Sequence, residues 1–403
     1  MARRLITSAG LLFFGLAVFL FVAFRYLHFS TNSAVLYVIK DDSRIRLDTD
    51  ISFSEVDSLL FRVDATPLFN RLFEKIASAT DAPLLNVSFD ESRGRGVIKE
   101  FRPDGTRLEI ALSRYDHEEA SPAGIVIGGE FPIGDSAMVR EGGGMAYFNG
   151  EKWIHLWCTA NEGIALAGGG TVYEPQKWNY ASGRIIKGTF NEVILESEHT
   201  VSPGGEPLHI TRRLDLKAGD NFATLMIRIT NTGKRAISYD YAYGDEPWIG
   251  IFGSSEGEVG WTRDGLITHE TFINPLKYSL IGYADVGNKE AGENDRYSGY
   301  ANFIQWIDTV PSQVYVSNTF YEVGNRILDS RDNRVLNVVW KNQFLPPGTS
   351  KTYKLRIGFV RPGEDRFEVA RGLEAAASSQ TQETLKGRSE SRASKRFSAS
   401  SGS

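Results

Sequence analysis

The sequence predicts an all-β protein: a large antiparallel β-sandwich that follows one N-terminal transmembrane helix and a short helical stalk. From residue 84 to residue 373, turn-forming residues recur about every 8–12 residues, which is typical of sandwiches and barrels. Between these turns, apolar and polar residues alternate, as they do in half-buried antiparallel strands. The 403 residues include 24 Phe, 16 Tyr, 7 Trp and 40 Gly, a composition that favours strands and tight turns over long helices.

The N-terminal segment predicts a membrane anchor. Residues 5–24 are twenty residues without a charge. At about 1.5 Å per residue, a helix of this length spans the roughly 30 Å hydrocarbon core of a bilayer. Arg3 and Arg4 precede it, and their charge favours a cytoplasmic N-terminus. We therefore expect residues 1–30 to be a single-pass anchor, with the main domain periplasmic or extracellular.

A cleaved signal peptide is the alternative for this segment. Its apolar region is typically about 7–15 residues long and ends in a small-x-small cleavage site. Here the apolar run is longer, and bulky residues follow it over 24–29. These two features favour an uncleaved anchor.

Residues 31–83 are expected to form a linker and a helical stalk. Residues 34–50 are typical of a short strand followed by a charged link. Thr66 is a good N-cap, and Pro67 suits the first helical position. Apolar residues then recur on one face of a helix that ends near Thr80. They are Leu68, Phe69, Leu72, Phe73 and Ile76.

Two hairpins open the sandwich domain, which is expected over residues 84–373. Their strands are predicted over 97–101 with 107–112, and over 145–148 with 153–157. Asn149 and Gly150 form the second turn, because this dipeptide readily adopts the two positive φ angles of a tight hairpin.

The central stretch predicts four successive strands, over 192–201, 209–216, 222–230 and 236–243. Within residues 222–230, Ala223, Leu225, Ile227 and Ile229 share one face, and more polar residues share the other. Further strands are expected over 303–310, 314–322, 335–340 and 350–359.

Residues 374–403 are rich in Ser and poor in apolar residues, so we expect a disordered tail.

Residues 196–253 resemble the galactose mutarotase-like supersandwich. The similar residues are Thr211, Arg212, Arg213, Leu216, Gly219 and Asn221 on one strand, followed by Thr230-Asn231-Thr232-Gly233. Another strand then leads into the loop that carries the site in that family, here residues 239–248. Residues 345–353 look like the closing hairpin of the family. The resemblance implies the supersandwich fold and a concave sheet face that binds sugars.

The residues that carry epimerase chemistry in this family are not matched. Those enzymes use a His in the site loop as general acid and a Glu on a late strand as general base, and the proton shuttle needs both. The corresponding loop, 243–248, contains no His, and the late strand, 337–341, contains no Glu. The resemblance therefore implies the fold and a sugar-binding face but not the epimerase activity.

The candidate site residues are of two kinds. The catalytic candidates are Asp245, Glu246 and His155, and the carbohydrate-binding candidates are Trp153, Trp248, Tyr243 and Arg212. Carboxylates accept hydrogen bonds from sugar hydroxyls, an aromatic ring stacks on the apolar face of a sugar, and Arg suits an acidic one. Trp153, His155 and Trp157 share one strand face at period two. A surface turn at residues 245–248 and a packed core at 153–157 are the structural alternatives.

Composition and motifs exclude several classes of function. A formal charge of −5 argues against a nucleic-acid partner. The one cysteine, Cys158, excludes an internal disulfide framework and a cysteine-built zinc site. No phosphate loop or other cofactor motif occurs, so we expect neither a cofactor nor a metal.

The sequence as a whole predicts a membrane-anchored envelope protein that binds or modifies a carbohydrate or polysaccharide on the concave face of a β-supersandwich. The alternative is a non-catalytic scaffold or assembly protein of an envelope polysaccharide complex, with an envelope protein as partner. A sugar binder requires a cleft with aromatic and carboxylate side chains, whereas a scaffold requires a flat apolar patch of several hundred Å².

Overall fold

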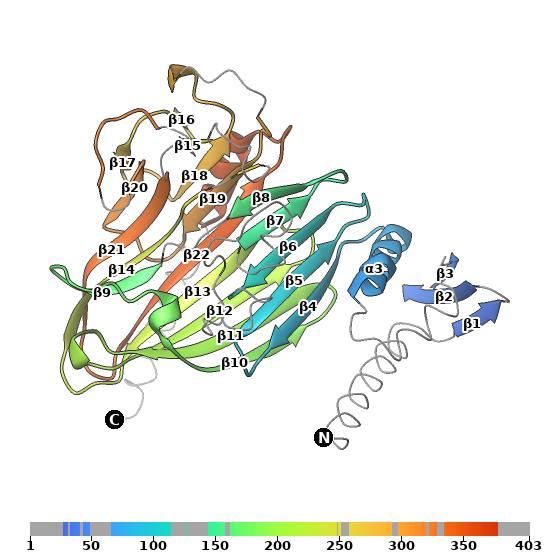
Figure 1. Ribbon diagram of the computed structural model, residues 1–403, viewed down its shortest axis with the longest axis horizontal. Helices are drawn as coiled ribbons and strands as arrows, with labels where there is room; N and C mark the ends of the chain where they lie inside the picture. The colour runs from blue at the N-terminus through green and yellow to red at the C-terminus, as the bar shows by residue number, and fades with distance from the viewer. Residues whose placement is uncertain are drawn as a thin grey trace, which may run out of the picture. The chain divides into compact units, whose positions relative to one another are not determined.

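The structure, a computed structural model, describes residues 27–30, 33–40, 43–48, 66–113, 127, 144–157, 162–247, 249–250, 258–291, 297–319, 322–328 and 334–377 (Figure 1). The predicted anchor over residues 5–24 lies outside these residues. Within them, no helix is both long enough and apolar enough to cross a bilayer. The chain divides into two compact units, Met1–Leu85 with Glu100–Arg107, and Asn86–Lys99 with Leu108–Ser403.

The first unit contains a small sheet and the predicted helix. β1 (Leu27–Ser30), β2 (Ser33–Lys40) and β3 (Ser43–Asp48) form a three-stranded antiparallel sheet, where the sequence predicts only one strand and a charged link. The helix α3 (Thr66–Thr80) is confirmed, and it packs beside β2 and β3. Its buried face includes Phe73, whose ring stacks on Phe101 with centroids 5.2 Å apart.

The second unit is built on a nine-stranded antiparallel sheet (Figure 1). In spatial order its strands are β10 (Asn179–Gly188), β11 (Glu192–Val201), β12 (Leu208–Lys217), β13 (Phe222–Asn231), β22 (Ser350–Val360), β19 (Ala301–Trp306), β18 (Leu280–Asp285), β15 (Glu258–Thr262) and β16 (Gly265–Ile267). The alternation predicted for residues 222–230 is confirmed, because Ala223, Leu225, Ile227 and Ile229 are all buried.

Two five-stranded sheets complete the architecture. The first has the order β17 (Thr271–Ile273), β20 (Gln313–Ser317), β21 (Val335–Leu345), β14 (Ile237–Asp245) and β9 (Gly163–Leu166). The second has the order β4 (Leu84–Asp90), β5 (Arg95–Phe101), β6 (Arg107–Leu112), β7 (Gly144–Phe148) and β8 (Trp153–Trp157), so both predicted hairpins are confirmed. The turn between β7 and β8 differs from the expected tight turn, because it spans residues 149–152 and only Gly150 in it has a positive φ. The described fold is therefore a mostly antiparallel sandwich with few helices.

The Thr-Asn-x-Gly motif marks the point where the chain changes sheet. The sequence predicts four successive strands over 192–243. Only the first three are neighbours, because β14 lies in the five-stranded sheet with β21 and β9. The buried side chain of Asn231 donates to the carbonyls of Arg235 and Leu345 and accepts from the N–H of Gly233. These three hydrogen bonds stabilise the crossing, because they join the end of β13 to the turn that follows it and to the end of β21.

Both five-stranded sheets pack on the same face of β22. The ring centroids of Tyr241 in β14 and Tyr353 in β22 are 4.7 Å apart. Those of Tyr147 in β7 and Phe359 in β22 are 5.1 Å apart. Tyr353 and Phe359 are six residues apart, so they share one face of their strand. Backbone hydrogen bonds between His155 and Gly250 then join β8 to the segment that follows β14. The core therefore lies between the nine-stranded sheet and this pair of sheets.

A C-terminal helix over residues 366–377 is absent from the sequence prediction. Its Ala370 belongs to a buried cluster with Trp261 and Phe303, so the helix covers apolar residues of β15 and β19. The predicted tail begins at residue 374, yet the helix continues to 377, and Glu374 of its last turn forms an ion pair with Arg263. Residues 378–403 lie outside the described part of the chain.

Candidate functional site

The strand β14 separates the core from a pocket. Tyr239, Tyr241 and Tyr243 are buried on one of its faces, as the packing against β22 requires. Asp240 and Ala242 point to the opposite face, where they line a pocket of about 320 Å³. The pocket therefore lies on the sheet that contains β14, β20 and β21, on the face that is turned away from the nine-stranded sheet.

Polar side chains from three neighbouring strands line the pocket. Asp240 comes from β14, Gln313 and Tyr315 from β20, and Asn337 and Lys341 from β21. The Nδ2 of Asn337 donates to the hydroxyl of Tyr315 over 2.9 Å. These groups offer amides, a hydroxyl, a carboxylate and an ammonium, which are the hydrogen-bonding groups that a polyhydroxylated ligand requires.

A glycine makes room for Asn337 on this face. Gly244 pairs with Asn337 across β14 and β21. A Cβ on Gly244 would lie 1.9 Å from the carbonyl oxygen of Leu336 and 2.4 Å from the Oδ1 of Asn337. Any other residue at this position would push the two strands apart, so the close approach that orients Asn337 requires glycine.

The apolar part of the lining includes one well-exposed aromatic ring. Phe272 of β17 has 54% of its surface exposed and meets the ring of Tyr315 edge-on, with centroids 5.9 Å apart. Val172, Val323 and Val339 also line the pocket. The exposed ring at the polar pocket is suited to stack on the apolar face of a sugar.

A β-bulge shapes the other end of the pocket. The register between β14 and β21 shifts between Tyr239 and Tyr241, and opposite this point Asn342 has a φ of 53°. Asp240 accepts a 2.7 Å hydrogen bond from the N–H of Asn342. Asn tolerates this left-handed conformation better than most residues, and bulges often redirect side chains near functional sites.

A buried ion pair supports the wall formed by the segment before β9. Glu162, which lines the pocket, accepts hydrogen bonds from Nη2 of Arg212 at 2.7 Å and from the hydroxyl of Tyr241 at 2.9 Å. Burial raises the pKa of Glu162, while Arg212 and Tyr241 oppose the rise by stabilising the carboxylate. Arg212 also lies 5.5 Å from the ring centroid of Trp178.

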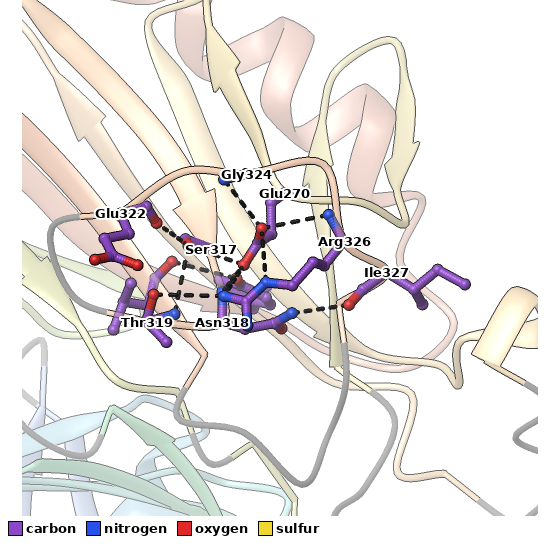
Figure 2. A network of polar contacts seen from close by, with 10 residues as sticks. Glu270, Ser317, Asn318, Thr319, Glu322, Gly324, Arg326 and Ile327 are labelled. Atoms are coloured by element: carbon purple, nitrogen blue, oxygen red, sulfur yellow. Dashed lines mark hydrogen bonds and ion pairs between the residues drawn. The ribbon is translucent and has the colours of Figure 1, made fainter.

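A second buried carboxylate supports the opposite wall. Glu270 directly precedes β17 and accepts hydrogen bonds from the backbone N–H groups of Asn318, Gly324 and Arg326 (Figure 2). The guanidinium of Arg326 and the hydroxyl of Ser317 also donate to it. Burial alone would raise the pKa of Glu270, but these hydrogen bonds outweigh it and lower the pKa to about 2.

This network holds two parts of the pocket together. Glu270 is two residues before Phe272, and Val323 lies between the segments that donate to its carboxylate. Both Phe272 and Val323 line the pocket, so the carboxylate of Glu270 fixes the two backbone segments that carry these lining residues. The groups that donate to Glu270 lie about 50 residues further along the chain, so no local sequence pattern at residues 269–270 indicates this network.

Four of the predicted site residues do not line this pocket. His155, Tyr243 and Arg212 are buried, with none of their surface exposed. Trp153 is half-buried and packs against Phe148, with ring centroids 5.5 Å apart. Since none of these four lines the pocket, we leave them out of the candidate site.

The loop after β14 is only partly described. Glu246 is half-buried and is not a pocket residue. Asp245 ends β14, but its side chain lies outside the described part of the structure, as does Trp248 entirely. A sugar site at Asp245, Glu246 and Trp248 therefore stays a prediction.

The predicted row of Trp153, His155 and Trp157 is interrupted. His155 pairs with Ala146 and Trp157 pairs with Met145, so one extra residue lies between the two positions on β8. This irregularity breaks the period-two pattern on which a common face depends. Trp157 is buried, and its Nε1 donates to the carbonyl of Gly358 in β22.

Sequence reasoning missed the pocket residues for an identifiable reason. Ser238, Asp240 and Ala242 alternate with three tyrosines, and this pattern assigns them to the outer face of their strand. It does not reveal which strands lie beside β14.

Among the described residues, no cluster of three or more His, Cys, Asp or Glu is arranged to hold a metal ion.

No protein-family model matches the chain, and neither does any curated protein. Similar solved structures include a galactose mutarotase-like protein from Clostridium acetobutylicum, which is 9% identical with a TM-score of 0.35 over 70% of this chain and 99% of its own. The Slr1438 protein from Synechocystis sp. PCC 6803 is 9% identical with a TM-score of 0.36, over 69% of this chain and 96% of its own.

A GH36 α-galactosidase, AgaA, from Geobacillus stearothermophilus is 11% identical with a TM-score of 0.34. It is matched over 70% of this chain but only 41% of its own. The structural neighbours at low identity include one that is described as galactose mutarotase-like. TM-scores below 0.5 are too low to carry a site or an activity to this chain.

Proposed function

We propose that the protein is a membrane-anchored envelope protein that binds a carbohydrate in the pocket on the outer face of β14, β20 and β21. The observation that carries this proposal is the lining of the pocket. It combines the exposed ring of Phe272 with the polar groups of Asp240, Asn337 and Lys341.

The chemistry of the lining suits a sugar. The hydroxyl groups of a sugar donate to carboxylates and accept from ammonium and amide groups, while its C–H face stacks on an aromatic ring. The pocket volume of about 320 Å³ is at the lower end of the range for small-molecule sites. The anchored walls keep these groups in place before a ligand arrives, which reduces the ordering cost of binding.

Three of the exposed apolar residues lie too far apart to form the single patch that a scaffold requires. Ile185 and Ile186 lie on β10 and Leu266 lies on β16, which are the two opposite edge strands of the nine-stranded sheet. A scaffold requires its exposed apolar side chains to gather in one patch. In the described part of the chain, these three lie at opposite edges.

Anchoring and location remain part of the proposal. Residues 5–24 would span the membrane with the N-terminus in the cytoplasm, and the sandwich would lie in the periplasm or outside the cell. The uncharged run and the arginines before it support this orientation.

A glycan array probed with the purified full chain tests the binding proposal. We expect the wild-type protein to retain at least one envelope glycan, and Phe272→Ala to lower that affinity by about tenfold, because a stacked ring contributes up to roughly 1.5 kcal/mol. Leu276→Ala is the matched control, since Leu276 is 84% exposed and is not a pocket residue. Retention of no glycan, or equal affinity of wild type and Phe272→Ala, would contradict the proposal.

A further inference from the structure

A second exposed aromatic ring lies on the same sheet face as the pocket. Phe344 of β21 is 63% exposed. It pairs with Ser238 of β14, and Ser238 shares a face with Asp240 and Ala242, because residues two apart on a strand point the same way. Directly paired residues also share a face, so Phe344 belongs to the face that carries the pocket.

The bulge in β21 is the reason that Phe344 is exposed. Trp340 is buried and points into the core, so regular alternation would direct Phe344 into the core as well. The extra residue at Asn342 reverses the alternation. Leu345 is buried instead, with 3% of its surface exposed, and Phe344 is turned outward. The hydrogen bond from the N–H of Asn342 to Asp240, a pocket residue, stabilises this arrangement.

The two exposed rings are too far apart for a single sugar ring. Ser238 is two residues from Asp240, so Phe344 lies about 7 Å along the strands beyond the polar end of the pocket. Phe272 is aligned with Tyr315, Asn337 and Gly244 across the sheet, six residues from Ser238 on β14. Phe272 and Phe344 are therefore separated by about 20 Å along the strand direction.

We infer that Phe344 is a second stacking position and that the ligand is an extended oligosaccharide, several sugar units long, that follows the sheet face from Phe272 to Phe344. This inference rests on the proposed function and adds the length of the ligand and the direction in which it lies. The groups between the rings are polar, with Asn337 beside Phe272 and Asp240 and Lys341 nearer Phe344. A sugar chain presents a matching series of apolar faces and hydroxyl groups.

A chain-length series tests this inference. The probes are mono- to hexasaccharides, prepared by partial hydrolysis of the polysaccharide that the full chain retains best on the array, and the measurement is titration calorimetry. We expect affinity to rise with length. Phe344→Ala should lower the affinity for the hexasaccharide by about tenfold and that for the monosaccharide by less than about twofold.

Two further variants make the test specific. Phe344→Trp keeps an aromatic face, so it should keep the gain in affinity with length, and Leu276→Ala should leave every affinity unchanged. Phe344 is exposed, so Phe344→Ala should melt at the wild-type temperature, which excludes loss of folding as the cause.

Failure of this inference differs from failure of the proposed function. If the monosaccharide binds as tightly as the hexasaccharide, or if Phe344→Ala weakens both equally, the protein binds sugar but Phe344 is not a stacking position. If Phe344→Ala instead converts a dimer to a monomer in sedimentation, without any dependence of affinity on length, Phe344 belongs to a protein contact and the inference is overturned. If no glycan is retained, the proposed function itself fails.

Discussion

Two buried glutamates support opposite walls of the pocket, and their pKa values shift in opposite directions. Glu162 receives two hydrogen bonds, both from side chains. Glu270 receives hydrogen bonds from three backbone N–H groups as well as from the side chains of Arg326 and Ser317. The pKa of Glu162 is raised, whereas that of Glu270 is lowered to about 2.

The difference shows that burial alone does not decide the ionisation of a carboxyl group. Both side chains are fully buried, so both lose the hydration that favours the charged form. What differs is the number of donors. Glu162 depends mainly on Arg212, whose Nε and Nη1 have no hydrogen-bond partner within the described structure. Glu270 collects donors from an entire loop, so its charge is well stabilised and the loop is fixed in return.

The largest expected effect comes from breaking the Glu162–Arg212 pair. Arg212→Leu should lower the free energy of unfolding by about 3–5 kcal/mol, because it leaves a buried carboxylate without its cation. Urea unfolding of the full chain measures this change. Arg213→Leu is the matched control, since Arg213 is partly exposed in its pair with Asp215 and should cost less than about 1 kcal/mol.

The double variant Arg212→Leu with Glu162→Leu sharpens this result. It removes both charges, so it should recover much of the stability that Arg212→Leu loses. Equal stability losses in the single and double variants would show that packing around Arg212, rather than its charge, supports this wall.

A smaller effect is expected at Glu270. Glu270→Gln keeps the size of the side chain but loses the charge that strengthens its hydrogen bonds, so the free energy of unfolding should fall by about 2 kcal/mol. Urea unfolding again provides the measurement. Glu322→Gln is the control, because Glu322 is exposed and lies in the same loop. Equal stabilities for these two variants would contradict the role given to Glu270.

The two glutamates should also respond oppositely to pH. The folded-state pKa of Glu270 is lowered from 4.5 to about 2, so its contribution to stability is present above pH 4.5 and is lost as the pH falls towards 2. The pKa of Glu162 is raised above 4.5, so its contribution is present below that pH and is lost as the pH rises through the folded-state value.

Unfolding measured from about pH 3 to pH 8 should separate these contributions. The stability difference between wild type and Glu270→Gln should shrink as the pH is lowered below 4.5. The stability difference between wild type and Glu162→Gln should change most above pH 4.5. If both differences follow the same pH dependence, the contrast between the two walls is wrong.

The smallest expected effect is at the bulge. Asn342→Ala places a residue with a Cβ but no local hydrogen-bonding group in the left-handed conformation, and we expect a loss of about 1 kcal/mol. Asn342→Gly should stay near wild type, since glycine adopts this conformation freely. Thermal melting distinguishes the two, and a larger loss for glycine than for alanine would show that backbone conformation is not the cause.

The sequence predicts much of the fold because most of its signals are local. Asn149-Gly150 marks a hairpin, Thr66-Pro67 marks a helix start, and the alternation at residues 222–230 marks a half-buried strand. The strands β1 to β3 differ from the prediction in number, and the helix over 366–377 is unpredicted. That helix is stabilised by packing against Trp261 and Phe303, which are distant in sequence.

The candidate site could not be predicted in the same way. Phe272, Asp240 and Asn337 come together only because β17, β20, β21 and β14 are neighbours, and this order depends on the chain changing sheet at Asn231. The exposure of Phe344 depends on one extra residue in a strand that alternates regularly before it. Sheet order and bulges arise from long-range pairing, which a local pattern does not contain.

The central claim is that a sugar binds on the outer face of β14, β20 and β21. Photo-crosslinking of the full chain with a diazirine-bearing oligosaccharide, taken from the glycan that the array identifies, followed by peptide mass spectrometry, tests it most directly. We predict labelled peptides that contain Phe272, Asp240 and residues 337–344. Labelling confined to residues 153–157 and 245–248 would place the sugar at the residues first suggested by sequence and would contradict the pocket assignment.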